Sequence, residues 1–172
     1  MKCDYCEILQ DKRHLLYEDK DIAVAMKDTA LSPGQVTIFP KQHFTILEQV
    51  PNDVLERCTS MSNKIGIAVF ESLGCHGTNI IAQNGLAAGQ VVPHFALEII
   101  PRMENDNLPL QWQPMQLMED EIDQAHAILI SQIEKMAKEE NKKEVVVPQA
   151  KEKIDHDATK ENYLLKSIRR LP

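Results

Sequence analysis

A histidine and a glutamate stand four residues apart in VVPHFALEIIPR, residues 91–102, a stretch with the pattern of a β-strand. Side chains two apart in a strand share a face, so His94, Ala96 and Glu98 line one side. The opposite side begins at Phe95, is apolar, and is predicted to be the buried one. The face with the imidazole and the carboxylate is then free to present groups that transfer protons or bind a metal. The alanine between them supplies neither.

Two cysteines near the start of the chain, Cys3 and Cys6, have the CxxC spacing of a metal-binding pair. No apolar segment of the signal-peptide type surrounds them, and no run of about eighteen apolar residues occurs, which favours a cytoplasmic protein that does not enter a membrane. In that compartment the four cysteines are expected to be thiols or metal ligands rather than disulfides. Cys58 falls on the apolar side of a predicted helix and is assigned to core packing.

Short strands and helices must position these groups. Strand patterns occupy residues 14–19, 21–28, 35–39 and 77–85, ahead of the strand that carries His94. Apolar residues at three- and four-residue steps predict one helix over residues 52–70 and a second over residues 119–140. Strands grouped before and after a helix, joined by short links, indicate an α+β domain with an antiparallel sheet. We predict one domain over residues 1–103, and a C-terminal helix with an extended arm over residues 104–172.

Four motifs, in the right order, resemble the histidine triad (HIT) family. That family carries His-x-His-x-His, then apolar residues that commonly end in IIPR, and the matching stretch here is GQVVPHFALEIIPR. The segment SPGQVTIFPKQH resembles the family's glycine, strand and PKxH histidine, and NIIAQNGLAAGQ resembles the turn before the triad. The start, CDYCEIL, resembles the CxxC of the zinc-containing bacterial and archaeal members. The resemblance covers residues 1–103.

The resemblance implies a fold, an assembly and an activity. The fold is a HIT-like half-barrel antiparallel sheet of about five strands with two helices. Members usually form homodimers, and they hydrolyse or transfer at the α-phosphate of a nucleotide, where the middle histidine attacks phosphorus. In this sequence Ala96 stands at the nucleophile and Glu98 at the third histidine, and Val91 replaces a hydroxyl that contacts the phosphate. A methyl group has no lone pair, so it cannot form the covalent intermediate.

The same resemblance implies a structural zinc site. In the zinc-containing members, two cysteines, the PKxH histidine and the first triad histidine form a four-ligand site, and these are Cys3, Cys6, His43 and His94 here. A closed Cys₂His₂ set suits zinc that ties the N-terminus to two strands. The simpler interpretation is two thiols and two unrelated histidines.

A nucleotide pocket is also implied by the resemblance. Asp28 would accept hydrogen bonds from ribose hydroxyls, while Tyr5 and Ile8 would flank the base. Phosphate contacts and a close approach of the backbone are assigned to Gln83, Gly89 and Gln90. The alternatives are a surface carboxylate at position 28, turn hydrogen bonds from the two glutamines, and ordinary packing of the other two side chains.

Three functions are compatible with these residues. The first is a HIT-like protein that binds a nucleotide or a related ligand with little or no hydrolysis. The second is a nucleotide hydrolase or transferase with altered chemistry, in which Glu98 is a general base or holds a catalytic metal. The third is a protein-interaction module that captures a partner through the C-terminal extension. The formal net charge of −7 argues against general binding of nucleic acid.

Overall fold

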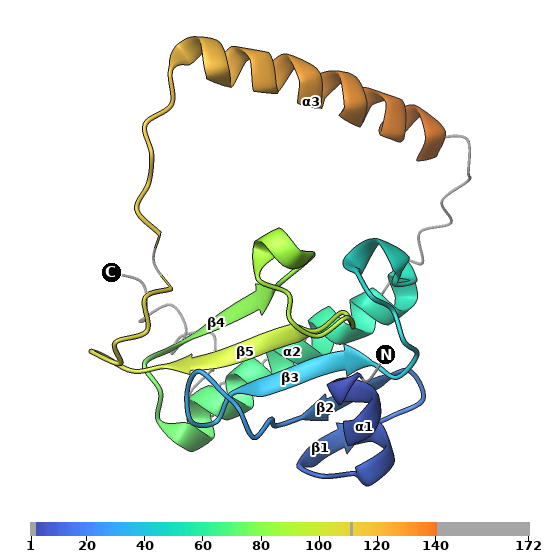
Figure 1. Cartoon of the computed structure of the whole chain (residues 1–172), viewed down its shortest axis with the longest axis vertical. Coiled ribbons are helices and arrows are strands. Elements are labelled where there is room, and N and C mark those ends of the chain that lie inside the picture. Colours follow the sequence, from blue (N-terminus) through green and yellow to red (C-terminus); the bar gives the residue numbers. More distant parts are fainter. Residues whose placement is uncertain (1–2, 111, 141–172) are drawn as a thin grey trace, which may run out of the picture. The chain divides into compact units, whose positions relative to one another are not determined.

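The structure, a computed structural model, describes residues 3–110 and 112–140 of the 172-residue chain (Figure 1). The chain divides into two compact units, one of which reaches Leu108 while the other begins at Pro109. The predicted domain boundary between residues 103 and 104 stays a prediction.

The first unit is built on a five-stranded sheet in the order β1-β2-β3-β5-β4, and every neighbouring pair is antiparallel. Its strands are β1 Leu15–Glu18, β2 Ile22–Ala25, β3 Val36–Pro40, β4 Gly77–Ala82 and β5 Leu97–Arg102. Each lies within or beside a segment whose alternation predicted a strand. The predicted α+β fold with an antiparallel sheet is confirmed.

Helix α2, Asn52–Leu73, covers one face of this sheet. It follows Pro51, whose ring fixes φ, and it ends at Gly74, where a left-handed φ of 64° favours glycine. Its inner side joins the main apolar cluster together with alternate residues of the strands. Cys58 lies in that inner side and is fully buried, so its predicted role in core packing is confirmed.

Helix α1, Asp4–Asp11, packs on the opposite face of the sheet, over β2 and β3. Its Tyr5 ring stacks on Phe39 with the ring centroids 4.8 Å apart. The β2 residues on this face are Ala23 and Ala25, and their small side chains let the helix lie close to the sheet. The short N-terminal helix is thereby held beside the strand that carries the candidate site.

The strand predicted over residues 91–102 is shorter in the structure, where β5 begins only at Leu97. Its pairing ends at Leu97, which lies opposite Ala82 of β4 and Ile38 of β3. Pro93 also lacks the N–H that a continued ladder would need. Residues 91–96 therefore form a bent loop that leads into the strand.

The predicted alternation of faces around this loop and strand is confirmed. Phe95 belongs to the cluster under α2, and Ala96 belongs to the cluster under α1. The expectation that the face with His94 and Glu98 is open is wrong, because these side chains are only 2% and 8% exposed. Helix α1 and its Tyr5 cover them.

The second unit contains helix α3, Glu119–Glu140, which has the predicted bounds. Three acidic residues occupy its first turn, and Glu121 Oε2 accepts a hydrogen bond of 3.0 Å from the Met118 backbone N–H. The part of the predicted extended arm that follows residue 140 lies outside the described residues. In the described part of the chain, the search for a helix with the length and apolarity of a membrane span found none.

Candidate functional site

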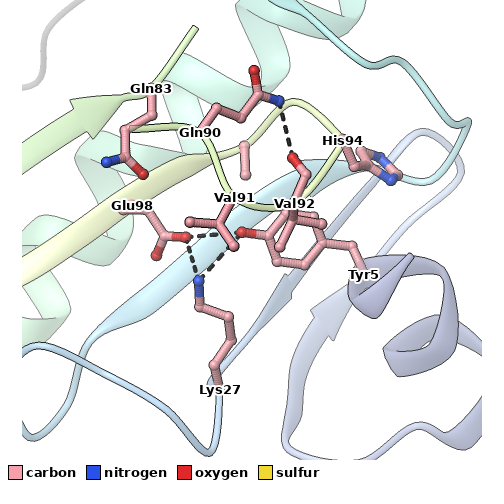
Figure 2. A pocket seen from close by; sticks show the side chains of 9 residues that line it. Tyr5, Lys27, Gln83, Gln90, Val91, Val92, His94 and Glu98 are labelled. Atoms are coloured by element: carbon pink, nitrogen blue, oxygen red, sulfur yellow. Dashed lines mark hydrogen bonds and ion pairs between the residues drawn. The ribbon is translucent and has the colours of Figure 1, made fainter. Parts of the chain in front are cut away.

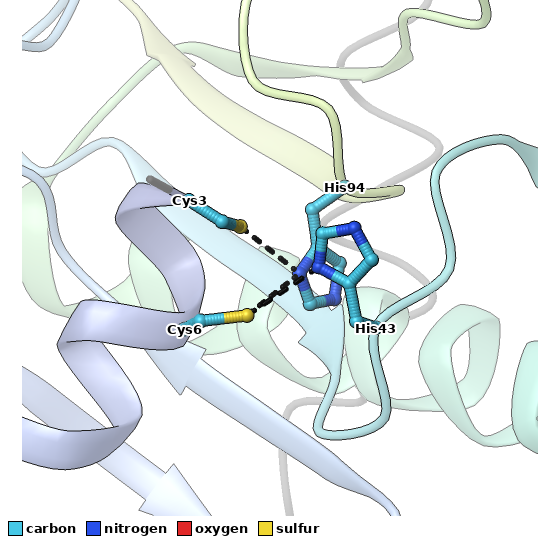
Figure 3. Close-up of side chains that lie close together, drawn as sticks. All are labelled: Cys3, Cys6, His43 and His94. Carbon is cyan, nitrogen blue, oxygen red and sulfur yellow. Dashed lines mark hydrogen bonds between the residues drawn. The ribbon is translucent and has the colours of Figure 1, made fainter. Parts of the chain in front are cut away.

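Two cysteines and two histidines meet where α1 approaches the loop before β5 (Figure 3). Cys3 Sγ lies 3.4 Å from His94 Nδ1, and Cys6 Sγ lies 3.4 Å from His43 Nδ1 and 3.8 Å from His94 Nδ1. No two of the four potential ligand atoms are more than 4.8 Å apart. The sequence places these residues up to 91 positions apart, and the fold brings them together.

The separations of these atoms fit a four-coordinate zinc ion. Zn–S bonds of about 2.3 Å and Zn–N bonds of about 2.0–2.1 Å in a tetrahedron separate the ligand atoms by about 3.3–3.8 Å. Three of the measured separations have this length. The donor set, two thiols and two imidazoles, is one that zinc prefers in closed structural sites.

The hydrogen bonds of His94 fix the tautomer that such a site requires. Its Nε2 lies 2.9 Å from the Pro40 carbonyl oxygen, which can only accept, so Nε2 carries the proton and Nδ1 has the lone pair. Burial lowers the pKa of His94 despite that hydrogen bond, so the ring is neutral at pH 7. Its free lone pair faces the sulfur atoms of Cys3 and Cys6.

The Cys6 thiol depends on a cation for ionisation. Burial and then the neighbouring Cys3 raise the pKa of Cys6 to about 11 in the absence of metal. A dication at the centre of the four ligands reverses that balance, because a coordinated thiol loses its proton. Metal binding at this site therefore releases protons.

A small pocket of about 100 Å³ lies beside the cluster, between α1 and the loop before β5 (Figure 2). Its walls come from α1, the segment after β2, the β4–β5 connection and β5. The lining residues are Tyr5, Lys27, Gln83, Gln90, Val91, Val92, His94, Ala96 and Glu98. Ala96 contributes a methyl group where the flanking His94 and Glu98 contribute polar side chains. The pocket thus has charged and polar walls and no nucleophile at this position.

Four donors surround the buried Glu98 carboxylate. Tyr5 Oη and Lys27 Nζ donate to Oε1 at 2.9 and 2.8 Å. Gln35 Nε2 and Thr37 Oγ1 donate to Oε2 at 2.8 and 2.7 Å. An ionised carboxylate offers about four lone-pair positions, so these four bonds occupy its capacity.

These bonds keep Glu98 ionised although it is buried. Burial alone opposes ionisation, but the hydrogen bonds from Lys27 and Gln35 outweigh it and hold the pKa of Glu98 below its ordinary value. Burial and the negative charge of Glu98 raise the pKa of Tyr5, so the phenol keeps the proton that it donates. Lys27 and Glu98 form an ion pair at one side of the pocket.

Several predicted nucleotide contacts do lie at the pocket. Tyr5, Gln83 and Gln90 line it. The side-chain amide of Gln90 is hydrogen-bonded to backbone groups. Its Nε2 donates to the carbonyls of Thr45 and Val92, and its Oε1 accepts from the Gly85 N–H.

Gly89 lies against Gln83, a residue of the pocket wall, and its predicted role in the approach to a phosphate stays a prediction. It has a φ of 83°, which favours glycine, and a Cβ there would lie 2.9 Å from Gln83 Nε2. A side chain at this position would therefore push Gln83 from its place.

Two predicted contacts lie elsewhere in the described structure. Asp28 is exposed, does not line the pocket, and pairs with Arg13 at 2.7 Å and His14 at 3.1 Å. Ile8 is half buried and packs against the apolar cluster under α1. Their roles in nucleotide binding stay predictions.

Sequence reasoning missed three polar residues of the site, Lys27, Gln35 and Thr37. A signal for two of them was present, because Gln35 and Thr37 are polar residues two apart at the start of an apolar strand. Thr37 is the direct cross-strand partner of Glu98 in the β3–β5 ladder. Lys27 follows the end of β2, and no local pattern predicted that it would meet Glu98.

The fold and the site define a small α+β domain with an open five-stranded antiparallel sheet, a pocket on one face and a Cys₂His₂ cluster beside it. Comparison with protein families finds a match to the HIT domain over residues 9–105. That match covers more than half of the chain, so the chain belongs to the HIT family.

Named relatives extend this result. The adenylylsulfatase HINT3 of Arabidopsis thaliana is 38% identical over 109 residues, which are 62% of this chain and 55% of that protein. The chain thus spans about half the length of this relative. The uncharacterised HIT-like protein MJ0866 of Methanocaldococcus jannaschii is 32% identical over 107 residues, which are 60% of this chain and 81% of that protein.

Solved structures agree with the fold. A zinc-bound histidine triad family protein from Mycobacterium smegmatis has a TM-score of 0.59 and 27% identity over 67% of this chain and 85% of that one. A histidine triad nucleotide-binding protein from Candida albicans has a TM-score of 0.68 and 23% identity over 78% of this chain and 99% of that one. The second likeness concerns the fold alone.

Proposed function

We propose that this protein is a HIT-family binding protein that holds a nucleotide or a related ligand in the pocket beside Ala96, with little or no hydrolysis. The observation that carries the proposal is the methyl group of Ala96 in the pocket wall, at the position that matches the family's nucleophile. Nucleotidyl transfer through a covalent histidine intermediate needs a lone pair there. The two flanking side chains do not supply it.

His94 is unsuited to replace the missing nucleophile. Its Nε2 proton is held by the Pro40 carbonyl, and its Nδ1 lone pair faces Cys3 and Cys6. We assign His94, with these two thiols and His43, to a structural zinc ion. The ion would hold α1 to the loop before β5 and so close one side of the pocket.

Glu98 is equally unsuited to the altered chemistry considered above. Its four hydrogen bonds leave no lone pair for a substrate proton or a catalytic metal. Its lowered pKa also makes it a weak base at pH 7. A hydrolase that depends on Glu98 is therefore the less favoured function.

The assignment of a nucleotide rests on the family and on residues that remain at the pocket. Tyr5, Gln83 and Gln90 line it, and Gly89 lets Gln83 stay there. The Arabidopsis relative is named for adenylyl sulfate, in which an adenylyl phosphate bears a sulfate. We therefore expect the ligand to be an adenine nucleotide or a related molecule that carries a phosphate or sulfate group. We also expect the protein to be a cytoplasmic homodimer.

Calorimetric titration of the zinc-loaded protein with AMP tests this function. We expect a Kd in the micromolar range and about one site per chain. We also expect Asp28→Ala to weaken binding if this carboxylate turns from its partners Arg13 and His14 to the ribose. Glu71→Ala, a change of an exposed carboxylate on α2, is the matched control. If titration up to millimolar AMP gives no heat of binding, the proposal is contradicted.

A second candidate function concerns the C-terminal unit. Helix α3 repeats apolar residues at helical spacing, namely Ile122, Ala125, Leu129, Ile133 and Met136. Such a stripe is typical of a helix that packs on another surface, so this unit would serve as a protein-interaction module. A full-length Leu129→Glu/Ile133→Glu variant that keeps AMP binding and loses a defined protein partner would favour this function.

A further inference from the structure

Lys27 and Glu98 are the two charged residues among those that line the pocket. They differ in how many of their donor or acceptor positions remain without a hydrogen bond in the described structure. Glu98 has four donors on its two oxygens, which fills its lone pairs. Its carboxylate oxygens are therefore hydrogen-bonded to protein groups, among them Tyr5 of α1 and Thr37 of β3.

The Lys27 ammonium keeps one donor for another group. It has three N–H bonds, of which one points to Glu98 Oε1 at 2.8 Å and one to Tyr5 Oη at 3.3 Å. In the described part of the chain no further acceptor of Lys27 is found. Its side chain is one-quarter exposed and lines the pocket, so the remaining N–H is accessible from the cavity.

The position of Lys27 is fixed by a chain of contacts rather than by its own backbone. Gln35 and Thr37 on β3 hold Oε2 of Glu98, while Oε1 receives Tyr5 and Lys27. Figure 2 shows the side chains of Glu98, Tyr5 and Lys27 converging at one side of the pocket. A long, flexible lysine is thereby held in one place, which lowers the entropy lost when it binds a ligand.

We infer that Lys27 is the oxyanion contact of this pocket, that it donates its remaining ammonium N–H to a phosphate or sulfate group of the ligand, and that Glu98 is a positioning residue that holds Lys27 without touching the ligand. This inference rests on the proposed function and deepens it. The pocket keeps one imidazole of the triad pattern, that of His94, and adds one fixed ammonium group, that of Lys27. Lys27 attracts an oxyanion but, when protonated, has no lone pair with which to attack phosphorus.

Gln83 supports the same assignment from the other side of the pocket. No hydrogen bond of its side-chain amide is found among the described residues, and it lies against Gly89 at the pocket wall. An oxyanion placed near Ala96 would have the Lys27 ammonium on one side and this amide on the other. Val91 and Val92 supply apolar wall beside them.

Calorimetry of the full-length, zinc-loaded protein with AMP, adenosine and inorganic phosphate tests the inference. Lys27→Gln keeps a donor for Glu98 and removes the positive charge, so we expect the Kd for AMP to rise about tenfold while the Kd for adenosine changes less than about twofold. Lys64→Gln, at an exposed lysine of α2, is the matched control and should leave both constants unchanged. A Lys27→Met/Glu98→Gln double variant gives the same test without an unpaired buried charge.

The Glu98→Gln variant tests whether Glu98 positions Lys27 or only repels the phosphate of the ligand. If Glu98 positions Lys27, this variant weakens AMP binding several-fold and leaves adenosine binding unchanged. If the carboxylate merely repels the ligand, the variant tightens AMP binding, and the inference is overturned.

The wild-type titrations distinguish failure of the inference from failure of the proposed function. AMP binding that Lys27→Gln does not weaken overturns the inference alone. Inorganic phosphate that binds as tightly as AMP, in a Lys27-dependent way and with no binding of adenosine, supports the oxyanion contact and overturns the nucleotide function. Binding of none of the three ligands overturns both.

Discussion

Replacing Cys6 with alanine is expected to abolish zinc binding and to lower the Tm by about 10 °C or more. Cys6 would supply one of the four ligand atoms of the proposed zinc site, and its loss leaves two histidines and one thiol. Structural zinc contributes several kcal/mol or more to the folded state because no site exists in the unfolded chain. Metal content by mass spectrometry and thermal unfolding by circular dichroism measure the two effects.

A matched control for the zinc site is His126→Ala, at an exposed histidine of α3. It should keep about one zinc per chain and the wild-type Tm. Addition of a strong chelator should bring the wild-type Tm down to that of Cys6→Ala and leave the variant unchanged. Equal zinc content in wild type and Cys6→Ala would contradict the assignment of this ligand.

Glu98→Ala is expected to lower the free energy of unfolding by about 3 kcal/mol. The substitution leaves the Lys27 ammonium without its counter-charge, and it removes the acceptor of Tyr5, Gln35 and Thr37. Chemical denaturation of the zinc-loaded protein measures the loss. Glu71→Ala, at an exposed position of α2, should change the free energy by less than about 0.5 kcal/mol.

A double-substitution cycle isolates the ion pair from the other effects. Lys27→Met alone leaves a buried carboxylate without its cation, so it should also destabilise the protein. Lys27→Met/Glu98→Ala should cost less than the two single losses added together, because neither charge is then left alone. Additive losses would show that the two groups are not coupled in the folded protein.

Much of the fold could be predicted from the sequence because its elements have clear periodicity. The bounds of α3 follow from apolar residues at helical steps. Along β2, β3 and β5 the alternation separates the apolar residues that pack under α2, such as Ile38 and Ile99, from those that pack under α1, such as Phe39. The start of β5 could not be predicted in this way. It depends on where β4 stops pairing, at Ala82, and on Pro93.

The candidate site was partly predictable for the same reason. The Cys3-x-x-Cys6 spacing is a local signal, and the family resemblance related it to His43 and His94. Glu98 is covered by Tyr5 of α1 and approached by Lys27, and these contacts join residues 93 and 71 positions apart in the sequence. No local pattern contains such contacts, which is why the carboxylate was expected on an open face.

A turnover assay, combined with analysis of the intact protein mass, tests whether Ala96 leaves the pocket without a nucleophile. The zinc-loaded protein is incubated separately with adenylyl sulfate and with a dinucleoside polyphosphate, and product release and protein mass are followed. We predict no adenylyl-protein adduct and product formation at the rate of the protein-free reaction. Turnover at an ordinary enzymatic rate, about 1–1,000 per second, that Glu98→Gln abolishes would show that the pocket carries out catalysis through Glu98.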